Sequence, residues 1–385
     1  SYLVFNLFKN YLLESGVPAK YIIEIALDER KNRIYRDPDT ILEYIENQIV
    51  DNGDYYLLLD EVQLLNEFEE VLNSLLHKPN LDIYVTGSNS KFLSKDIITE
   101  FRGRGDEIHV FPLTFKEFMQ TYPEDRYRGF ADYAMYGGLP LIISMKTEQQ
   151  KVQYLTTLFE ETYIKDIRER NRIGKLQELN DLINVLASAV GSLTNPSKIQ
   201  ATFKSQIHSD ISVNTVSQYI EFLEDAFLIN SANRFDVKGR KYIGTPLKYY
   251  FEDVGLRNAR LGFRQNEETH LMENIIYNEL RARGYQVDVG VVPIRKIDED
   301  GKRVRIQLEI DFIASMGSKK YYLQSAFSLP DEAKVKQEKA SLINVNDSFK
   351  KLVIVNDMMN IRRDDDGITT MNVYDFLLNK DSLDL

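Results

Sequence analysis

The stretch YYLLLDEVQLL, residues 55–65, sets an apolar segment directly before two carboxylates, Asp60 and Glu61. An unbroken apolar run of this length is typical of a strand that is covered on both faces of a parallel sheet. Such a strand ends either in a solvated acidic turn or at the catalytic edge of a nucleotide hydrolase, where an Asp helps to hold Mg²⁺ and the following Glu polarises water. The stretch alone leaves both interpretations open.

The segments around this strand alternate between extended and helical patterns. Extended apolar runs lie at 21–27, 55–60, 81–88 and 107–113, and helical periodicity lies at 2–15, 39–50 and 91–101. We expect Asp39 to cap the second helix. Strands that alternate with helices need crossover connections, so the pattern predicts an α/β fold with a mostly parallel sheet of the P-loop NTPase type.

Polar side chains follow the next strand of the predicted sheet. Thr86 and Ser88 stand where a side chain can touch both the γ-phosphate and the attacking water. Further along, Arg102 and Arg104 could stabilise charge that develops on the transferred phosphoryl group. Taken alone, these arginines fit a solvated turn with ordinary ion pairs better.

Four motifs in this order carry a resemblance: LLLDEVQLL, VTGSNSKFL, FRGRGDEIHVFPLTFKEF and YGGLP. Together they resemble bacterial and archaeal AAA-type (P-loop) ATPases that carry a C-terminal domain of unknown function. The resemblance implies ATP and Mg²⁺ as cofactors, Asp60 as the Walker B residue and Glu61 as the catalytic base. It also implies Thr86 or Ser88 as the sensor. Arg102 and Arg104 are then candidate arginine fingers.

The phosphate-binding loop G-x-x-x-x-G-K-[ST] does not occur in the sequence. In the family this loop stands immediately before the first helix, and here the first predicted helix opens beside Ser1. We therefore expect Ser1 to be the last residue of the loop and a ligand of nucleotide and Mg²⁺. A chain that began at Ser1 would hold a triphosphate weakly, because backbone N–H groups and the lysine of the loop supply most of the grip.

The middle of the chain predicts a helical segment at 141–195 and a winged-helix domain at 196–262, after an ATPase core at 1–140. The second helix of the winged-helix pattern would bury Val213, Val216, Ile220 and Leu223. It would present Asn214 and Gln218, which can read base edges. The basic residues of the following hairpin are Arg234, Lys238, Arg240, Lys241 and Lys248. DNA binding, with Lys238, Arg240 and Lys241 on phosphates, and packing against protein remain alternatives.

The last part, 263–385, resembles a restriction-endonuclease-like α/β domain. The resemblance places Glu273 on a helix and Asp311 on a strand, with Gln324 where a metal-binding Glu belongs and Ala326 where a lysine belongs. Because a neutral amide and a methyl group cannot replace a metal ligand and a water-activating lysine, we expect a degenerate nuclease site. Glu309 lies on the same strand face as Asp311 and could contribute a carboxylate.

The composition narrows the class of protein. The formal net charge is −11, which argues against a uniform nucleic-acid coat but leaves room for a local basic patch. Cysteine is absent, which excludes disulfides, and no apolar run or leader predicts a membrane or secreted protein, so we expect the cytoplasm. We expect a nucleotide-driven switch, with DNA or an unidentified protein as partner. The alternatives are a nucleic-acid-binding or interaction module with little ATPase activity, and a metal-dependent nuclease.

Overall fold

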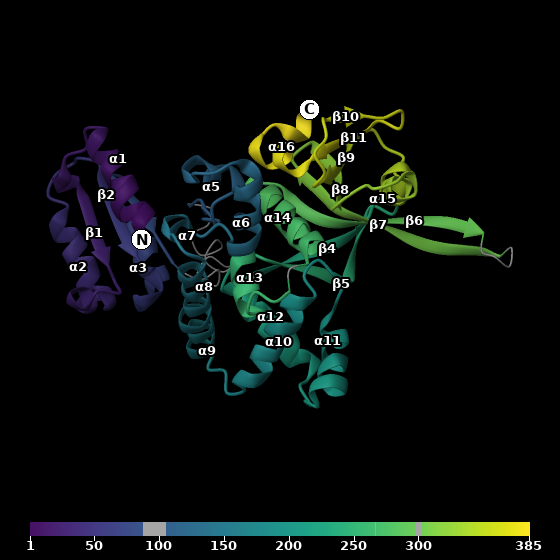
Figure 1. Cartoon of the computed structure of the whole chain (residues 1–385). Coiled ribbons are helices and arrows are strands. Elements are labelled where there is room, and N and C mark those ends of the chain that lie inside the picture. The colour runs from purple at the N-terminus through teal and green to yellow at the C-terminus, as the bar shows by residue number, and fades with distance from the viewer. Residues whose placement is uncertain (88–104, 266, 298–301) are drawn as a thin grey trace. The chain divides into compact units, whose positions relative to one another are not determined.

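The computed structural model describes residues 1–87, 105–265, 267–297 and 302–385. The chain forms two compact units, Ser1–His109 and Val110–Leu385, which are described separately (Figure 1). Ser88, Arg102, Arg104 and the helix expected at 91–101 lie outside the described residues.

The first unit contains a three-stranded parallel sheet in the order β1 (Ile22–Ala26), β2 (Tyr55–Asp60), β3 (Leu81–Val85). The central strand buries Tyr55 and its three leucines, as its apolar run predicts. Register pairs Ala26 with Asp60 and Leu59 with Val85, so the carboxyl ends of the strands lie at one edge. The α/β class predicted for this part of the chain is confirmed.

Helices flank this sheet. They are a π-helical segment at Leu3–Phe8 that runs into α1 (Lys9–Glu14), α2 (Pro38–Gln48), α3 (Phe68–Leu75), and short 3-10 turns at Ala19–Tyr21, Arg30–Arg36 and Val62–Leu64. Helices α2 and α3 pack on the sheet through an apolar core that includes Ile41, Ile45, Leu72 and Leu75.

Two local predictions for this unit are wrong. Helix α2 is capped by Asp37, whose carboxylate accepts the N–H of Thr40 at 3.0 Å, while Asp39 lies in the first turn. Pro38 fits the first helical position because its missing N–H would have no partner there. The stretch at 107–113 forms no strand, and two of its apolar side chains, Ile108 and Val110, are 84% and 64% exposed.

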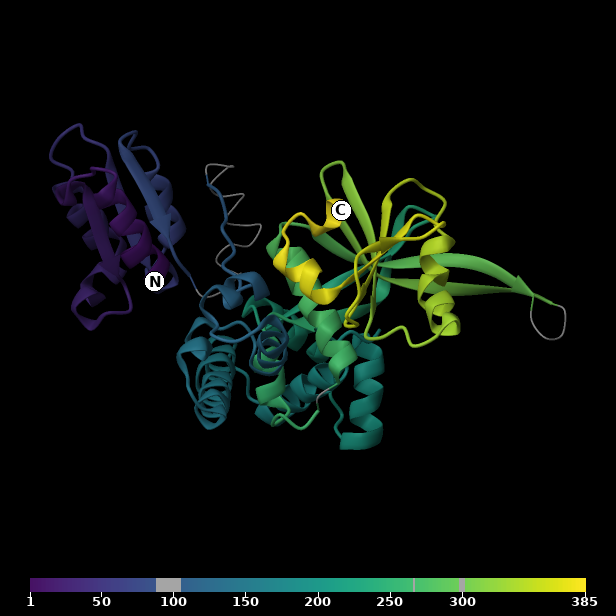
Figure 2. The same cartoon turned by 45° about the horizontal axis from the view of Figure 1, so that its top comes forward.

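The second unit is built on an eight-stranded mixed sheet in the order β10-β11-β9-β8-β7-β6-β4-β5 (Figure 2). Its strands are β4 (Ile229–Asp236), β5 (Lys241–Phe251), β6 (Gln286–Ile297), β7 (Arg303–Met316), β8 (Lys319–Ala326), β9 (Lys350–Val355), β10 (Arg362–Arg363) and β11 (Ile368–Asn372). The hairpin β4–β5 pairs through β4 with β6 in parallel. The expected wing is therefore continuous with the strands of the C-terminal part.

Helices surround this sheet and lie both above and below it in Figure 1. They are α5 (Phe115–Thr121), α6 (Arg126–Tyr136), α7 (Pro140–Ser144), α8 (Glu148–Thr157), the π-helical Leu158–Ile164, α9 (Lys165–Arg170), α10 (Leu176–Ser188), α11 (Pro196–Thr202), the π-helical Phe203–Ile207, α12 (Val213–Asp225), α13 (Val254–Arg260), α14 (Glu268–Ala282), α15 (Glu332–Ile343), α16 (Val373–Leu378) and the 3-10 turn Ser382–Asp384.

The sheet of the second unit separates two apolar cores. On one face α14 packs with Ile275 and Ile276 against Phe312, and Phe115 of α5 joins the same core. On the other face Leu342 of α15 packs on strand residues that include Tyr322 and Val353. Because α5 belongs to this core, the segment from Val110 onward is part of the second compact unit, whereas we expected the ATPase core to extend to residue 140.

The YGGLP motif forms a tight contact inside the second unit. Gly137 has φ +76°, and a Cβ there would lie 2.1 Å from an oxygen of Asp253. The Asp253 carboxylate accepts the N–H of Gly138 at 2.7 Å and that of Leu256 at 3.0 Å. Gly137 therefore lets the chain approach the start of α13 closely, and Gly138 leaves room for the carbonyl oxygen of Leu113, which would lie 2.3 Å from a Cβ there. Burial raises the pKa of Asp253 to about 6, although these N–H groups oppose it.

Candidate nucleotide-binding site

Asp60, Glu61 and Thr86 lie together at the carboxyl edge of the small parallel sheet. Asp60 is the last residue of β2, and Thr86 directly follows β3. The N–H of Thr86 donates to the carbonyl of Leu59 at 2.9 Å, and the N–H of Val62 donates to the carbonyl of Thr86 at 3.0 Å. These two backbone bonds extend the ladder past the strands and fix Thr86 beside the acidic pair.

The Thr86 hydroxyl links the two acidic residues. It donates to Oδ1 of Asp60 and accepts the N–H of Glu61 at 3.3 Å. Burial raises the pKa of Asp60, but hydrogen bonds from Ser1 and Thr86 outweigh it and hold this pKa below its ordinary value. Asp60 is therefore ionised at neutral pH although it is buried.

At Glu61 the backbone departs from the extended conformation of β2. Its φ of +53° lies in the left-handed region, which is uncommon for a residue with a side chain. Its carboxylate accepts a hydrogen bond from the Gln63 amide and is only half-buried. The turn thus separates a buried carboxylate, Asp60, from a more accessible one that water can reach.

The residues at this edge suit a Mg²⁺–nucleotide complex. Mg²⁺ prefers hard oxygen ligands and is usually held by one or two carboxylates together with substrate phosphates. Asp60 supplies one ionised carboxylate, and Ser1 and Thr86 supply hydroxyl groups around it. Among the described residues no group of three or more His, Cys, Asp or Glu forms a protein-only metal site.

The candidate DNA-contacting residues lie on the elements that the sequence predicts. On α12, Asn214 and Gln218 are exposed, while Val216, Ile220 and Leu223 are buried. Val213, expected on the buried face, is 38% exposed because it is the first residue of the helix. Three basic residues of the β4–β5 hairpin are exposed: Lys238, Arg240 and Lys241.

Two further basic residues of that hairpin are buried, contrary to the prediction. Arg234 donates to Oε1 of Gln307 on β7 at 3.2 Å. Lys248 points into the protein, where its Nζ lies 2.9 Å from Oε1 of Glu273, 2.8 Å from Oε1 of Glu309 and 3.3 Å from Oδ1 of Asp311. Both side chains are therefore unavailable to phosphates.

The Lys248 ammonium occupies the centre of the carboxylate group formed by Glu273, Glu309 and Asp311. Burial lowers its pKa, but the three carboxylates outweigh burial and raise the pKa above the ordinary value. Burial raises the pKa of Glu273, against the opposing effect of Lys248. Tyr250 also donates its hydroxyl to Glu273, at 2.7 Å. Three carboxylates that share one built-in ammonium form an internal ion cluster rather than an open metal site.

Glu309 and Asp311 share one face of β7 by strand periodicity, and a strand irregularity lies beside Asp311. Between Asp288 and Gly290, β6 advances two residues while β7 advances three, from Ile310 to Ile313. Such a bulge re-aims side chains. Gln324 contributes nothing comparable: its Oε1 accepts from the Ser341 hydroxyl of α15 at 3.4 Å. Glu309, and not Gln324, is therefore the third acidic position beside Glu273 and Asp311.

Comparisons with known proteins agree with the geometry of the first unit. Residues 1–119 match the AAA domain family, and residues 127–267 match a family described as "Domain of unknown function (DUF8612)". The N-terminal part is thus an AAA-type domain of the P-loop ATPase class.

Relatives extend over most of the chain. An uncharacterized protein of Haemophilus influenzae is 32% identical over 377 residues, which is 96% of this chain and 90% of that protein. An uncharacterized protein of Methanocaldococcus jannaschii is 26% identical over 345 residues, covering 86% and 72% of the two chains. The chain belongs to the same family as the Haemophilus influenzae protein.

One solved structure aligns with most of the chain at low similarity. The crystal structure of protein VC1899 from Vibrio cholerae aligns with 90% of this chain and 78% of its own, at 12% identity and a TM-score of 0.22. Among the described residues, no helix combines the length and the apolar character that crossing a bilayer requires.

Proposed function

We propose that this protein is a Mg²⁺-dependent ATP hydrolase that works as a nucleotide-driven switch. The observation that carries the proposal is the arrangement of Asp60, Glu61 and Thr86 at the carboxyl edge of a parallel sheet in an AAA-type domain. Mg²⁺, when bound with ATP, neutralises charge on the phosphate oxygens. Ser88, Arg102 and Arg104 stay candidates for the sensor and arginine fingers.

The residues present suggest how the reaction would proceed. Asp60, kept ionised by its hydroxyl partners, would hold the cation through its free oxygen or through water. Glu61 would orient a water molecule and take its proton as the water oxygen attacks the γ-phosphorus. The bond from that phosphorus to the bridging oxygen breaks, and ADP and inorganic phosphate leave. Thr86, which contacts both acidic residues, would fix the distance between cation and base.

The test is Glu61→Gln, measured on protein that carries a phosphate-binding loop before Ser1. The amide keeps the size of the side chain but cannot take a proton, so turnover should fall by about 100-fold or more while ATP binding stays. Glu14→Gln, at an exposed position of the same unit, is the matched control and should leave turnover unchanged. Unchanged turnover in Glu61→Gln would remove Glu61 from the mechanism.

A second function, DNA binding by the second unit, is supported by the exposed Lys238, Arg240 and Lys241 on the β4–β5 hairpin. With Asn214 and Gln218 on α12, they would form a helix-and-wing surface. Packing of this surface against a protein partner is the alternative. Nuclease activity is disfavoured because Lys248 occupies the carboxylate group.

A further inference from the structure

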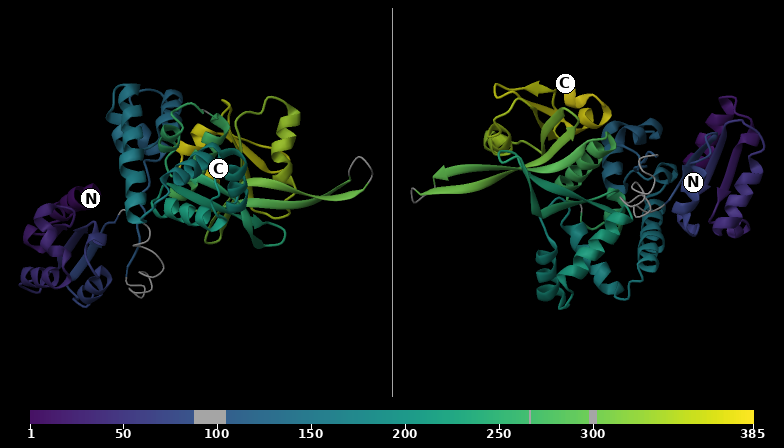
Figure 3. Two further views of the ribbon diagram at one scale, coloured as in Figure 1. Left: turned by 90° about the horizontal axis from the view of Figure 1, so that it is seen from below. Right: turned by 180° about the vertical axis from the view of Figure 1, so that it is seen from behind.

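The β6–β7 hairpin forms a long two-stranded arm. Its strands pair continuously from Gln286 opposite Ser315 to Ile297 opposite Arg303, apart from the bulge near Gly290. The far half of this arm projects from the rest of the second unit, with the end of β6 free of other strands (Figure 3). A two-stranded ribbon of this kind has the width that the major groove of duplex DNA admits.

One face of the arm carries three arginines. Residues directly opposite each other in an antiparallel pair share a face, so the pairs Arg295–Arg305 and Ile297–Arg303 lie on one side. The other side carries Ile294 opposite Ile306 and Lys296 opposite Val304. Like charges that stand directly opposite destabilise a sheet, so the Arg295–Arg305 pair has a cost that a bound polyanion would remove.

These arginines have no acidic partner within the parts of the chain that the structure describes. Arg295, Arg303 and Arg305 are exposed, and no ion pair joins any of them to a described carboxylate. The acidic side chain that follows Arg305 on β7, Glu309, is bound to Lys248. Ile297 is 65% exposed on the same face, where an apolar group could contact a thymine methyl.

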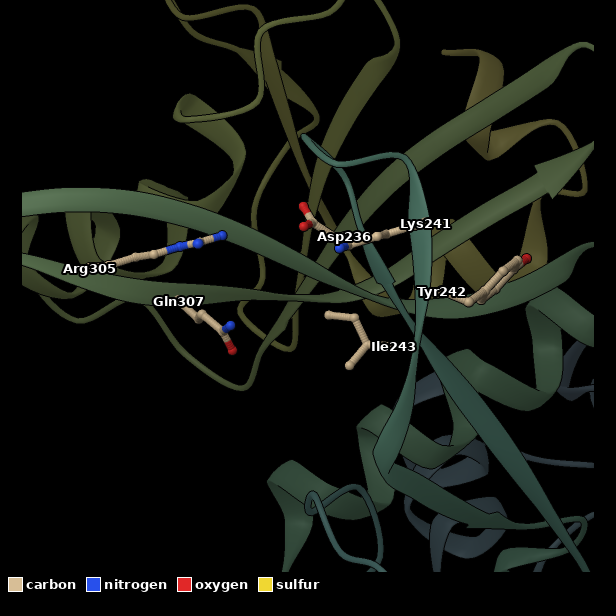
Figure 4. Close-up of a pocket in the computed structure, with 6 residues that line it drawn as sticks. All are labelled: Asp236, Lys241, Tyr242, Ile243, Arg305 and Gln307. Atoms are coloured by element: carbon tan, nitrogen blue, oxygen red, sulfur yellow. The ribbon is translucent and has the colours of Figure 1, made fainter.

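The arginine face continues onto the β4–β5 hairpin. A cavity of about 510 Å³ lies between the two hairpins, and its lining includes Lys241 and Tyr242 on one side and Arg305 and Gln307 on the other (Figure 4). Asp236 also lines it, but its Oδ1 already accepts the N–H groups of Lys238 and Gly239 at 3.1 and 2.9 Å.

We propose that the arm and the β4–β5 hairpin form one binding surface for duplex DNA. The arm would lie in the major groove with Arg295, Arg303 and Arg305 on phosphates and base edges, and Lys238 and Lys241 would contact flanking phosphates. Arg303 and Arg305 are roughly 7 Å apart along the strand, about twice the axial spacing of phosphates on one DNA strand. Residues 294–297 and 302–307 of the arm include five basic residues and no acidic one, so this part of the arm is complementary to phosphates, although Asp298, Glu299 and Asp300 stand between the two strands in sequence and the whole chain carries a net charge of −11.

This inference rests on the DNA-binding part of the proposed function and is independent of ATP hydrolysis. The test is fluorescence anisotropy with a short labelled DNA duplex over a range of salt concentrations. The variant Arg295→Gln/Arg303→Gln/Arg305→Gln should bind more weakly by about tenfold or more at low salt, and the slope of log affinity against log salt should shrink by about 0.9 for each phosphate that is no longer neutralised. The Lys238→Gln/Lys241→Gln variant should also weaken binding.

The matched control is Lys146→Gln/Lys165→Gln/Lys380→Gln, which removes three exposed charges from other elements of the same unit. It should keep the parental slope. Circular dichroism melting checks that each variant folds. If the arm variant with three Gln residues is unstable, Arg295→Lys/Arg303→Lys/Arg305→Lys, which keeps the three charges, should keep most of the parental slope. A duplex RNA of the same sequence should bind less well, because its narrow major groove does not admit the arm.

Equal slopes for the arm variant and the control would overturn the proposal, as would equal affinity for the two duplexes or no binding at low salt. ATP turnover measured on the same preparations separates this failure from a failure of the proposed ATPase, because Glu61→Gln should lower turnover by about 100-fold or more and leave DNA binding by the second unit intact.

Discussion

The two acidic sites of this protein contrast in what neutralises their carboxylates. In the first unit the hydrogen-bond partners of Asp60 are the hydroxyl groups of Ser1 and Thr86, and among the described residues no lysine or arginine side chain pairs with it. In the second unit three carboxylates surround the buried ammonium of Lys248. Clustered carboxylates alone therefore do not indicate a metal site. The group that already occupies the space between them decides whether a cation from solution can enter.

The largest effect on stability is expected when the Lys248 ammonium is removed. In Lys248→Met, three carboxylates would face one another without a cation, and leaving buried charges unpaired costs about 3–5 kcal/mol. We expect the free energy of unfolding, measured by urea titration, to fall by about this amount. Lys241→Met, at an exposed position of the same strand, should change it by less than about 0.5 kcal/mol. Similar effects of the two substitutions would contradict a buried ion cluster.

The pH dependence of stability tests the same cluster. Burial raises the pKa of Glu273 to about 7, whereas its ordinary value is 4.5. Between these two values the folded state holds a proton that the unfolded state has released, so this group lowers stability as pH rises from 4.5 to 7. Glu273→Gln cannot ionise. The melting temperature of Glu273→Gln minus that of the parent should therefore increase as pH rises from 4.5 to 7.

The control for this pH series is Glu161→Gln, because Glu161 is exposed. Its melting temperature should follow the parent at every pH. If the melting temperature of Glu273→Gln also followed that of the parent at every pH, the pKa of Glu273 would not be raised in the folded protein, and the account of the cluster would be wrong.

A smaller effect on stability is expected when the Thr86 hydroxyl, which contacts both Asp60 and Glu61, is removed. Thr86→Val keeps the branched shape but removes the donor to Asp60 and the acceptor for Glu61, at a cost of about 1–2 kcal/mol in stability. ATP turnover should fall because the pKa of Asp60 rises and the base loses its support. Thr86→Ser restores the hydroxyl and should recover most of both losses. A fully active Thr86→Val would show that the hydroxyl is dispensable.

No change at all is expected from Asp311→Ala in a nuclease assay. Parent and variant should both leave plasmid and single-stranded DNA intact in Mg²⁺ and in Mn²⁺, because Lys248 fills the carboxylate group and Gln324 and Ala326 offer no charge. Cleavage by the parent that disappears in Asp311→Ala would support the nuclease alternative instead.

The first site can be predicted from the sequence because its signals are local. The apolar run at 55–59 predicts β2, and the residue types that follow β2 and β3 predict that Asp60, Glu61 and Thr86 meet, since parallel strands end at one edge. The sequence places the cap of α2 two residues too late because Asp37 and Asp39 are equally suitable chemically, and only the backbone conformation separates them.

The second site cannot be predicted in this way. Lys248 lies in a basic hairpin and is of a residue type that is usually solvated. Its partners, Glu273 on α14 and Glu309 and Asp311 on β7, are distant from it in sequence. Strand periodicity places Asp311 and Glu309 on one face, but it does not reveal that this face meets Lys248 of β5 and Glu273 of α14. The one local hint is Glu309, which shares the strand face of Asp311 and can be identified as a further carboxylate.

The most direct test of this contrast is a Mn²⁺ titration followed by the electron paramagnetic resonance signal of the free ion, on protein that carries a phosphate-binding loop before Ser1. We predict a single tight Mn²⁺ that appears only when ATP is present, is lost in Asp60→Asn and persists in Asp311→Asn. Tight Mn²⁺ binding without ATP that Asp311→Asn abolishes would contradict the account, because it would show that the three-carboxylate cluster, and not Asp60, is the metal site.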